Sequence, residues 1–282
     1  MKMLVFNSLL MATAVTASYL PIRALPSRPS VPPAIVALRY TPVTLTVAAG
    51  PLRLAGAWEV QVDDPRFSGV SSLAIERGRF LAVSDRGSVT SFDRPGEQSS
   101  RAWVADLHEG PGPRGKKWTR DAESLAPDPK ARGWWVGFEQ NHSLWLYDPG
   151  FKRALVRIDL RRPDWWDNRG AEGLIAEGGH LLVLAENGRD AMRVSNGSIV
   201  RLALDAGADV SDSARSPNGG AWLLLRSRRW RGIHQSIAPL LKTPTGYSAG
   251  PAMPVPKGPF DNFEGMAIEA RPGGTLRFWL IT

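Results

Sequence analysis

Acidic residues recur at two positions of a degenerate repeat, and they are the side chains of this sequence best suited to chemistry. The first position precedes a short apolar run and holds Ser71, Glu123, Glu172, Asp212 and Glu264. The second follows the next apolar run and holds Asp85, Glu139, Glu186 and Ser227. Carboxylates that meet repel one another unless they are protonated, paired with arginine or bridged by a cation.

Oxygen-rich clusters suit hard cations, with Ca²⁺ as the first choice and Mg²⁺ as the second. The predicted metal ligands are Asp85, Glu123, Glu139, Glu172, Glu186 and Glu264. The alternative is that each acid caps a turn or accepts backbone N–H bonds within its own repeat, without any metal. The sequence leaves both interpretations open.

The elements that must position these acids are short strands. Neighbouring copies of the repeat lie roughly 40 to 50 residues apart, a spacing typical of propeller blades. The 28 Gly and 23 Pro residues suit many turns, and the 11 Trp residues suit packing between sheets. Equivalent positions of successive blades surround one axis, so the acids could converge there although they are far apart in the chain. We therefore predict an all-β fold, a β-propeller.

Individual strands and loops follow from local pattern. Alternating or continuous apolar runs predict the strands 35–38, 43–47, 58–62, 79–83 and 144–147. Two Gly- or Pro-rich segments, 108–120 and 235–259, predict long loops on one face.

Composition excludes several classes of site. Without cysteine, the chain has no disulfide, no thiolate metal site and no Cys nucleophile. It also lacks a G-x-S-x-G nucleophile elbow, which argues against a serine esterase, and a Gly-rich nucleotide loop. The net charge of +8 comes mostly from scattered arginines, and no recognised motif supports nucleic-acid binding. Arginine suits a small anionic or phosphorylated ligand instead.

The N-terminus has the pattern of an export signal. Lys2 precedes an apolar stretch over 4–17, and small residues offer cleavage positions, so residues 1–20 are predicted to be a signal peptide. The stretch is short for a membrane span, and an uncleaved anchor is the alternative. No cysteine is present for lipidation, so a periplasmic or secreted protein is expected. A Pro-rich linker with the first strands over 21–48 would then lead into a propeller domain over 49–282.

The sequence resembles the phytase-like family of exported bacterial proteins, also called the esterase-like activity of phytase family, over about residues 50 to 282. The matching segments are FLAVSDRG (80–87), DAESLAPDP (121–129), WVGFEQNH (135–142), NRGAEGL (168–174), LLVLAENG (181–188) and DNFEGMAIE (261–269). The resemblance implies an exported propeller with six blades. Similar sequences continue with an acid after the last strand, which here would fall beyond Thr282, so either the last blade is incomplete or the chain is a fragment. Ser71 and Ser227 also interrupt the acidic columns in two blades. The acidic segments expected of a calcium-dependent β-propeller phytase are not found in the sequence, and this argues against phytate itself as the substrate.

The enzymatic hypothesis is calcium-assisted hydrolysis of a phosphate ester. In it Glu123, Glu172 and Glu264 are catalytic carboxylates, and His142, in a predicted turn after Glu139, is a candidate acid or base. The predicted substrate-binding residues, which lie beside the repeat motifs, are Arg86, Arg120 and Arg169. The alternative is a non-catalytic envelope propeller that binds a ligand or a protein partner. The oligomeric state is not determined by the sequence.

Overall fold

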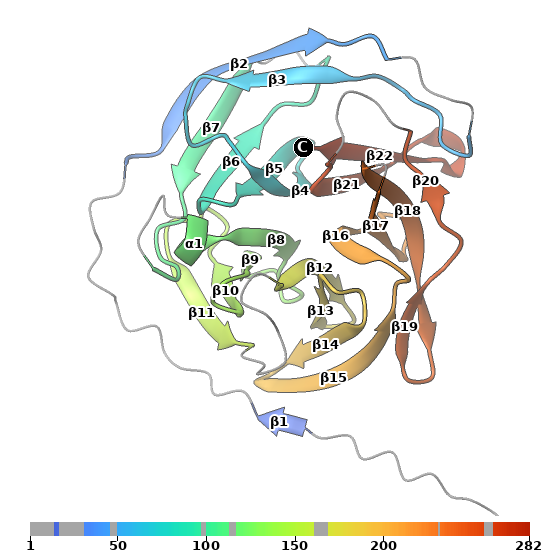
Figure 1. Cartoon of the computed structure of the whole chain (residues 1–282). Helices are drawn as coiled ribbons and strands as arrows, with labels where there is room; N and C mark the ends of the chain where they lie inside the picture. Colours follow the sequence, from blue (N-terminus) through green and yellow to red (C-terminus); the bar gives the residue numbers. More distant parts are fainter. Residues whose placement is uncertain are drawn as a thin grey trace, which may run out of the picture.

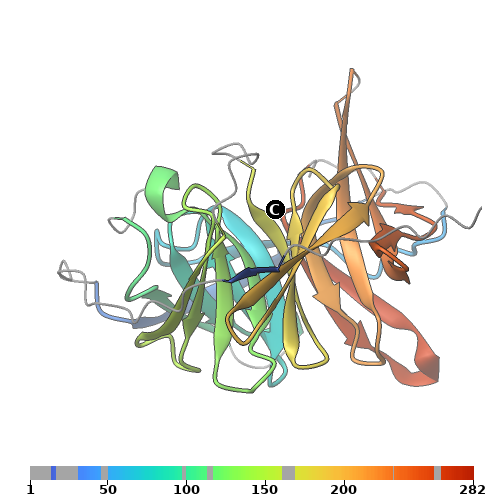
Figure 2. The ribbon, with the colours of Figure 1, turned by 90° about the horizontal axis from the view of Figure 1, so that it is seen from below.

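The computed structural model describes residues 14–16, 31–45, 50–96, 100–112, 117–160, 169–230, 232–256 and 262–282. Its strands form blades arranged around one axis, as Figure 1 shows. Figure 2, turned by 90°, shows the blades side by side with their hairpins at the two ends of the molecule. The prediction of an all-β propeller is confirmed.

The first blade is a six-stranded sheet in the order β3-β2-β7-β6-β5-β4. Its strands are β2 (Ala34–Pro42), β3 (Trp58–Val62), β4 (Val70–Glu76), β5 (Arg79–Ser84), β6 (Ser88–Phe92) and β7 (Arg101–Asp106). The second blade consists of β8 (Ala122–Pro127), β9 (Trp134–Phe138), β10 (Ser143–Tyr147) and β11 (Ala154–Asp159). A short helix, α1 (Lys117–Arg120), precedes β8.

The third and fourth blades share one sheet because β15 pairs in parallel with β19. The third contains β12 (Ala171–Glu177), β13 (His180–Ala185), β14 (Asp190–Ser195) and β15 (Ser198–Asp205). The fourth contains β16 (Asp209–Arg215), β17 (Ala221–Arg229), β18 (Gly232–Thr243), β19 (Gly246–Ala249) and β20 (Met253–Pro254). The last sheet pairs β21 (Gly265–Ala270) with β22 (Leu276–Ile281), and a 3₁₀ turn (Pro272–Gly274) joins them.

Five inner strands, β4, β8, β12, β16 and β21, surround the axis in the described part of the chain (Figure 1). Each contacts its two neighbours, and β21 lies beside β4, so the ring closes. The expected number of six blades is therefore not confirmed. The ring closes with five because the two-stranded last sheet packs directly against the first.

The apolar core lies between blades. Strands β9 and β10 are buried at every residue, because both of their faces are covered by neighbouring sheets. One cluster joins Leu144 and Leu146 of the second blade to Leu181 and Val183 of the third. Burial between blades fixes each inner strand, and with it the side chains at the strand's start.

Most of the strand predictions agree with the structure. The strand 58–62 coincides with β3, and the strands 35–38, 79–83 and 144–147 lie within β2, β5 and β10. No strand covers 43–45, and residues 46–47 lie outside the described part.

The loop predicted over 235–259 is wrong, because most of β18 and all of β19 and β20 lie there. β18 tolerates Pro239, although proline has no N–H to donate to a neighbouring strand.

The structure describes only part of the N-terminal segment for which predictions were made. Of the predicted signal peptide over 1–20, only β1 (Ala14–Thr16) is described, and it pairs with β15. Within the predicted linker over 21–48, β2 joins the first blade by pairing with β7. No helix among the described residues is long and apolar enough to span a membrane.

Candidate metal centre

Carboxyl groups of the second and third blades converge at the start of the inner strands. One ligand oxygen from each of Asp121, Glu123 and Glu139 lies within 4.8 Å of the other two, and the same holds for Glu139, Glu172 and Glu186. Asp121, Glu139, Glu172 and Glu186 are buried, Glu123 is partly buried, and Glu139 belongs to both groups. The predicted convergence is thus present for four of the six predicted ligands.

Local backbone geometry aims these side chains. The pairing register of β8 with β9 shifts between Ala122 and Ser124, and that of β12 with β13 shifts between Ala171 and Gly173. Each shift is a β-bulge that leaves one residue, Glu123 or Glu172, outside the regular alternation. The bulge therefore redirects an acid at the same place in each blade.

The backbone at Gly170, before the third blade, lies very close to the backbone of Glu139. A Cβ atom added at Gly170 would lie 2.7 Å from the Cα atom of Glu139. Because real Cβ contacts are not that short, only glycine allows the start of the third blade to lie against Glu139. Glu186 is held in turn by its backbone N–H, which donates to the Gly170 carbonyl at 3.1 Å.

Burial and mutual repulsion oppose ionisation of the cluster. Burial raises the pKa of Glu123, and the neighbouring Glu172 raises it further. Burial and then Glu139 and Glu186 raise the pKa of Glu172. The pKa of Glu139 rises to about 8, through burial and then Asp121 and Glu186. Protons or a cation must compensate these carboxylates near neutral pH.

Cationic side chains compensate only the edges of the cluster. Lys117 lies 2.9 Å from Asp85 and 3.9 Å from Asp121, and so links the first blade to the second. Asp85 Oδ1 and Asp121 Oδ1 are buried and accept no hydrogen bond from the described residues. Buried carboxylate oxygens without donors, in an all-oxygen ligand set, fit a hard divalent cation.

In the fourth blade an arginine stands where the other blades have a second-column acid. Val210 pairs with Leu225, just as Val70 pairs with Ser84 and Ala122 with Phe138. The position equivalent to Asp85 and Glu139 is therefore Arg226, and the assignment of Ser227 to this column is wrong by one residue. The Arg226 guanidinium lies 2.8 Å from Glu186 and 3.7 Å from Glu264.

The same register corrects the first column. The bulge of the fourth blade falls at Ser211, so Asp212 is one residue past the position of Glu123 and Glu172. Asp212 instead accepts the backbone N–H groups of Ser213 and Met266, both at 2.7 Å, and the Ser72 hydroxyl at 3.2 Å. Asp212 thus ties three parts of the ring together, which is the structural role that the sequence left open.

The remaining predicted residues lie around the cluster. Glu264 is at the rim, where its side chain is 37% exposed and accepts a hydrogen bond from Asn262 at 2.6 Å. Arg169 lies 3.8 Å from Glu186, and Arg86 lies 4.0 Å from Asp85. The Arg86 side chain is exposed to solvent, and the Arg169 side chain is partly exposed. These two guanidinium groups could contact an anion bound at the cluster while they remain next to Glu186 and Asp85.

Arg120 and His142 donate hydrogen bonds to backbone carbonyl groups. The buried Arg120 guanidinium donates to the carbonyls of Leu107 at 2.8 Å and Pro111 at 3.4 Å. These bonds hold the 107–111 loop. His142 closes the turn after β9, with its N–H donating to the Glu139 carbonyl at 2.9 Å. It belongs to neither group of candidate ligands, and its acid–base role stays a prediction.

Sequence reasoning missed Asp121, Lys117 and Arg226 as members of the site. Asp121 stands two residues before Glu123, inside the DAESL segment, and this spacing was the available signal. Lys117 and Arg226 had none, because only the arrangement of the blades brings them to the carboxylates.

The profile of the phytase-like family, described as esterase-like activity of phytase, matches residues 65–282. The chain belongs to the phytase-like family. No curated protein matches the sequence.

Three solved structures are similar to this phytase-like protein. Hydrazine synthase of Kuenenia stuttgartiensis is 13% identical, with 75% of this chain and 55% of that chain covered and a TM-score of 0.40. A Lactobacillus plantarum protein is 15% identical, with 74% and 63% covered and a TM-score of 0.43. An auxiliary nutrient binding protein of Bacteroides thetaiotaomicron is 12% identical, with 72% and 64% covered and a TM-score of 0.41. The chain spans less than two thirds of each of these proteins.

Proposed function

We propose that this phytase-like protein binds a divalent cation at the carboxylate cluster, Ca²⁺ in preference to Mg²⁺, and hydrolyses phosphate esters there. The observation that carries the proposal is the pair of three-carboxylate groups that share Glu139. Their ligand atoms come from two blades and are buried, so the fold itself assembles them. Ca²⁺ accepts six to eight oxygen ligands in flexible geometry, which suits such a set better than Mg²⁺.

The residues divide into three roles. The cation is held by Asp121, Glu123, Glu139, Glu172 and Glu186. Lys117 connects Asp85 to this set, because it lies close to both Asp85 and Asp121. When bound, the cation would supply charge for the phosphate oxygens and lower the pKa of a bound water.

Two arginines are suited to bind the anionic ligand. Arg169 is 41% exposed beside Glu186, so its guanidinium can turn outward to phosphate oxygens. Arg86 is 60% exposed, and among the described residues its guanidinium forms one long ion pair, with Asp85 at 4.0 Å. Arg226 differs, because its side chain is 9% exposed and holds Glu186 and Glu264 in place.

Proton transfer is assigned to carboxyl groups within or beside the cluster. Glu264 is the most exposed of them, and so can exchange a proton with solvent. Glu123 and Glu172 are the further candidates, and His142 is the only candidate that is not a carboxylate. The apolar segment at residues 4–17 supports export to the periplasm or beyond, where a small phosphorylated ligand would be met.

The test combines calorimetry with a hydrolysis assay. Calcium and magnesium are titrated into the wild type, Glu139→Gln and the control Glu59→Gln, which alters an exposed acid on β3. Hydrolysis of p-nitrophenyl phosphate is then measured with calcium and with a chelator. We expect binding and turnover in the wild type and the control, and neither in Glu139→Gln.

Two other outcomes separate the alternatives. Calcium binding without turnover on any phosphate ester would favour a non-catalytic propeller in which the cation is structural. Absence of binding in a folded wild-type protein would exclude the metal centre.

A further inference from the structure

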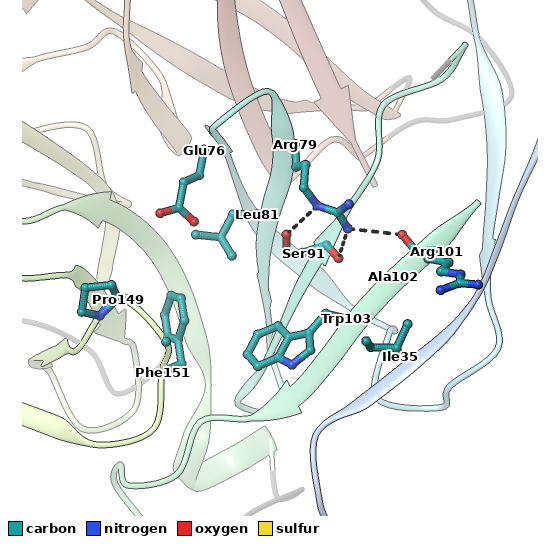
Figure 3. A pocket seen from close by; sticks show the side chains of 11 residues that line it. Ile35, Glu76, Arg79, Leu81, Ser91, Arg101, Ala102, Trp103, Pro149 and Phe151 are labelled. Atoms are coloured by element: carbon teal, nitrogen blue, oxygen red, sulfur yellow. Dashed lines mark hydrogen bonds between the residues drawn. The ribbon is translucent and has the colours of Figure 1, made fainter. Parts of the chain in front are cut away.

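A cavity lies between the first two blades, at the far end of β4 from the carboxylates. Its volume is about 440 Å³, within the size range of small-ligand pockets. Figure 3 shows Glu76 and Arg79 above it, and Leu81, Trp103 and Phe151 among its walls. β4 runs from Ser71 near the axis to Glu76, about 17 Å at strand spacing, so this cavity is separate from the metal centre.

Glu76 belongs to a further column of acids, five residues after each bulge. The equivalent residues are Asp128, Glu177, Ser216 and Glu269 in the second to fifth blades. Asp128, Glu177 and Glu269 each have a basic partner, namely Arg132 at 2.8 Å, Lys242 at 2.8 Å and Arg94 at 3.1 Å.

An aromatic donor accompanies each of these cations. The side chains of Trp135, Tyr247 and Trp279 donate hydrogen bonds to the same three carboxylates at 2.8, 2.9 and 3.2 Å. Acid, base and aromatic group thus recur together in three blades. The first blade has the acid and a nearby aromatic residue, Trp103, but Glu76 has no basic partner among the described residues.

The missing partner has a structural reason. Arg79 is the cross-strand neighbour of Glu76, but its guanidinium is directed elsewhere. It pairs with Asp93. It also donates to the Ser91 hydroxyl at 3.2 Å and to the Arg101 carbonyl at 3.3 Å, as Figure 3 shows. Glu76 is therefore left half-buried beside a cavity rather than beside a cation.

We propose that this cavity binds a small organic cation, an amine or guanidinium attached to an apolar body. The cationic group would pair with Glu76, in the place that Arg132, Lys242 and Arg94 take in the other blades. The apolar body would lie against Trp103 and Phe151, where aromatic faces also attract cations.

Two nearby arginines do not oppose this assignment. Arg79 is neutralised by Asp93. Arg101 also lines the cavity, but it is on β7, three strand spacings or about 14 Å between strand backbones from Glu76, and its side chain is exposed to solvent. A cationic group paired with Glu76 would therefore lie at the other end of the cavity from the Arg101 backbone.

The test uses three probes of similar shape and different charge, phenethylammonium, 2-phenylethanol and phenylacetate. Their affinities are measured by nuclear magnetic resonance titration of the full chain. We expect phenethylammonium to bind about tenfold more tightly than the alcohol, the effect of one charge-assisted hydrogen bond, and phenylacetate to bind least.

Variants locate the effect. Glu76→Gln is expected to reduce the preference for the cation to unity. Glu177→Gln, which alters the equivalent but already paired acid, is expected to preserve it, and Trp103→Leu to weaken the cation and the alcohol together. Equal affinity for cation and alcohol, a preference that survives Glu76→Gln, or no binding of any probe would overturn the proposal.

Discussion

Replacement of Glu139 by glutamine is the sharpest probe of the carboxylate cluster, because Glu139 belongs to both groups of ligands and is 8% exposed. The pKa of its carboxyl is raised from 4.5 to about 8. An acid whose pKa is raised on folding stabilises the folded state below pH 4.5, and this contribution is lost as the pH rises to about 8. The cation-free wild type should therefore become less stable over this interval.

The magnitude follows from the shift. One pKa unit corresponds to about 1.4 kcal/mol, so the shift of Glu139 corresponds to about 5 kcal/mol. Asp121 and Glu186 share this repulsion, which makes about 5 kcal/mol an upper bound for the single residue. Glu139→Gln should thus be more stable than the wild type at about pH 8.5 without calcium, and similar to it near pH 4.5.

Calcium should reduce this difference in stability between the variant and the wild type. At a hundred times its dissociation constant, a cation that binds only the folded state adds about 2.7 kcal/mol. We expect this gain in the wild type and its loss in Glu139→Gln.

The assay is urea unfolding followed by tryptophan fluorescence, with calcium or chelator, at both pH values. Glu59→Gln, on the exposed side of β3, serves as the control. A variant that is less stable than the wild type at high pH without calcium, or that keeps the calcium gain, would refute the reasoning.

Three further predictions follow from the same site. Calcium binding near pH 7 should release about one proton or more, because Glu139 is mostly protonated there. The calorimetric enthalpy of binding should then depend on the ionisation enthalpy of the buffer. A binding enthalpy that is independent of the buffer would contradict this prediction. Arg226→Met should destabilise the cation-free protein by about 3 kcal/mol, because Glu186 loses its buried partner, and should tighten calcium binding; weaker binding by calorimetry would count against the assigned geometry. Asp212→Ala should lower the free energy of unfolding by about 2 to 4 kcal/mol in urea, because it removes the acceptor of two backbone N–H groups, and should leave the calcium affinity of the folded protein unchanged.

The sequence by itself determined the fold class and most of the acidic columns. Short apolar runs and turn glycines are local features that recur along the chain, and an acid recurs at the start of the inner strand in the second, third and fifth blades. Residues Glu123, Glu172, Glu139 and Glu186 could be chosen from this pattern because their copies of the repeat are well preserved.

Only the tertiary structure decided the fourth blade, the number of blades and the members of the site. In the degenerate fourth copy of the repeat, the sequence pattern fits Asp212 and Ser227 as well as it fits Ser211 and Arg226. The hydrogen-bond register between β16 and β17 shows that Ser211 and Arg226 are the residues equivalent to those of the other blades. A one-residue slip in a strand moves a side chain to the other face of the sheet. The sequence prediction for the fourth blade was displaced by one residue, so it assigned Ser227 to the position that Arg226 occupies. The partnerships of Lys117 with Asp85 and of Arg226 with Glu186 join residues distant in sequence, and no local propensity encodes them.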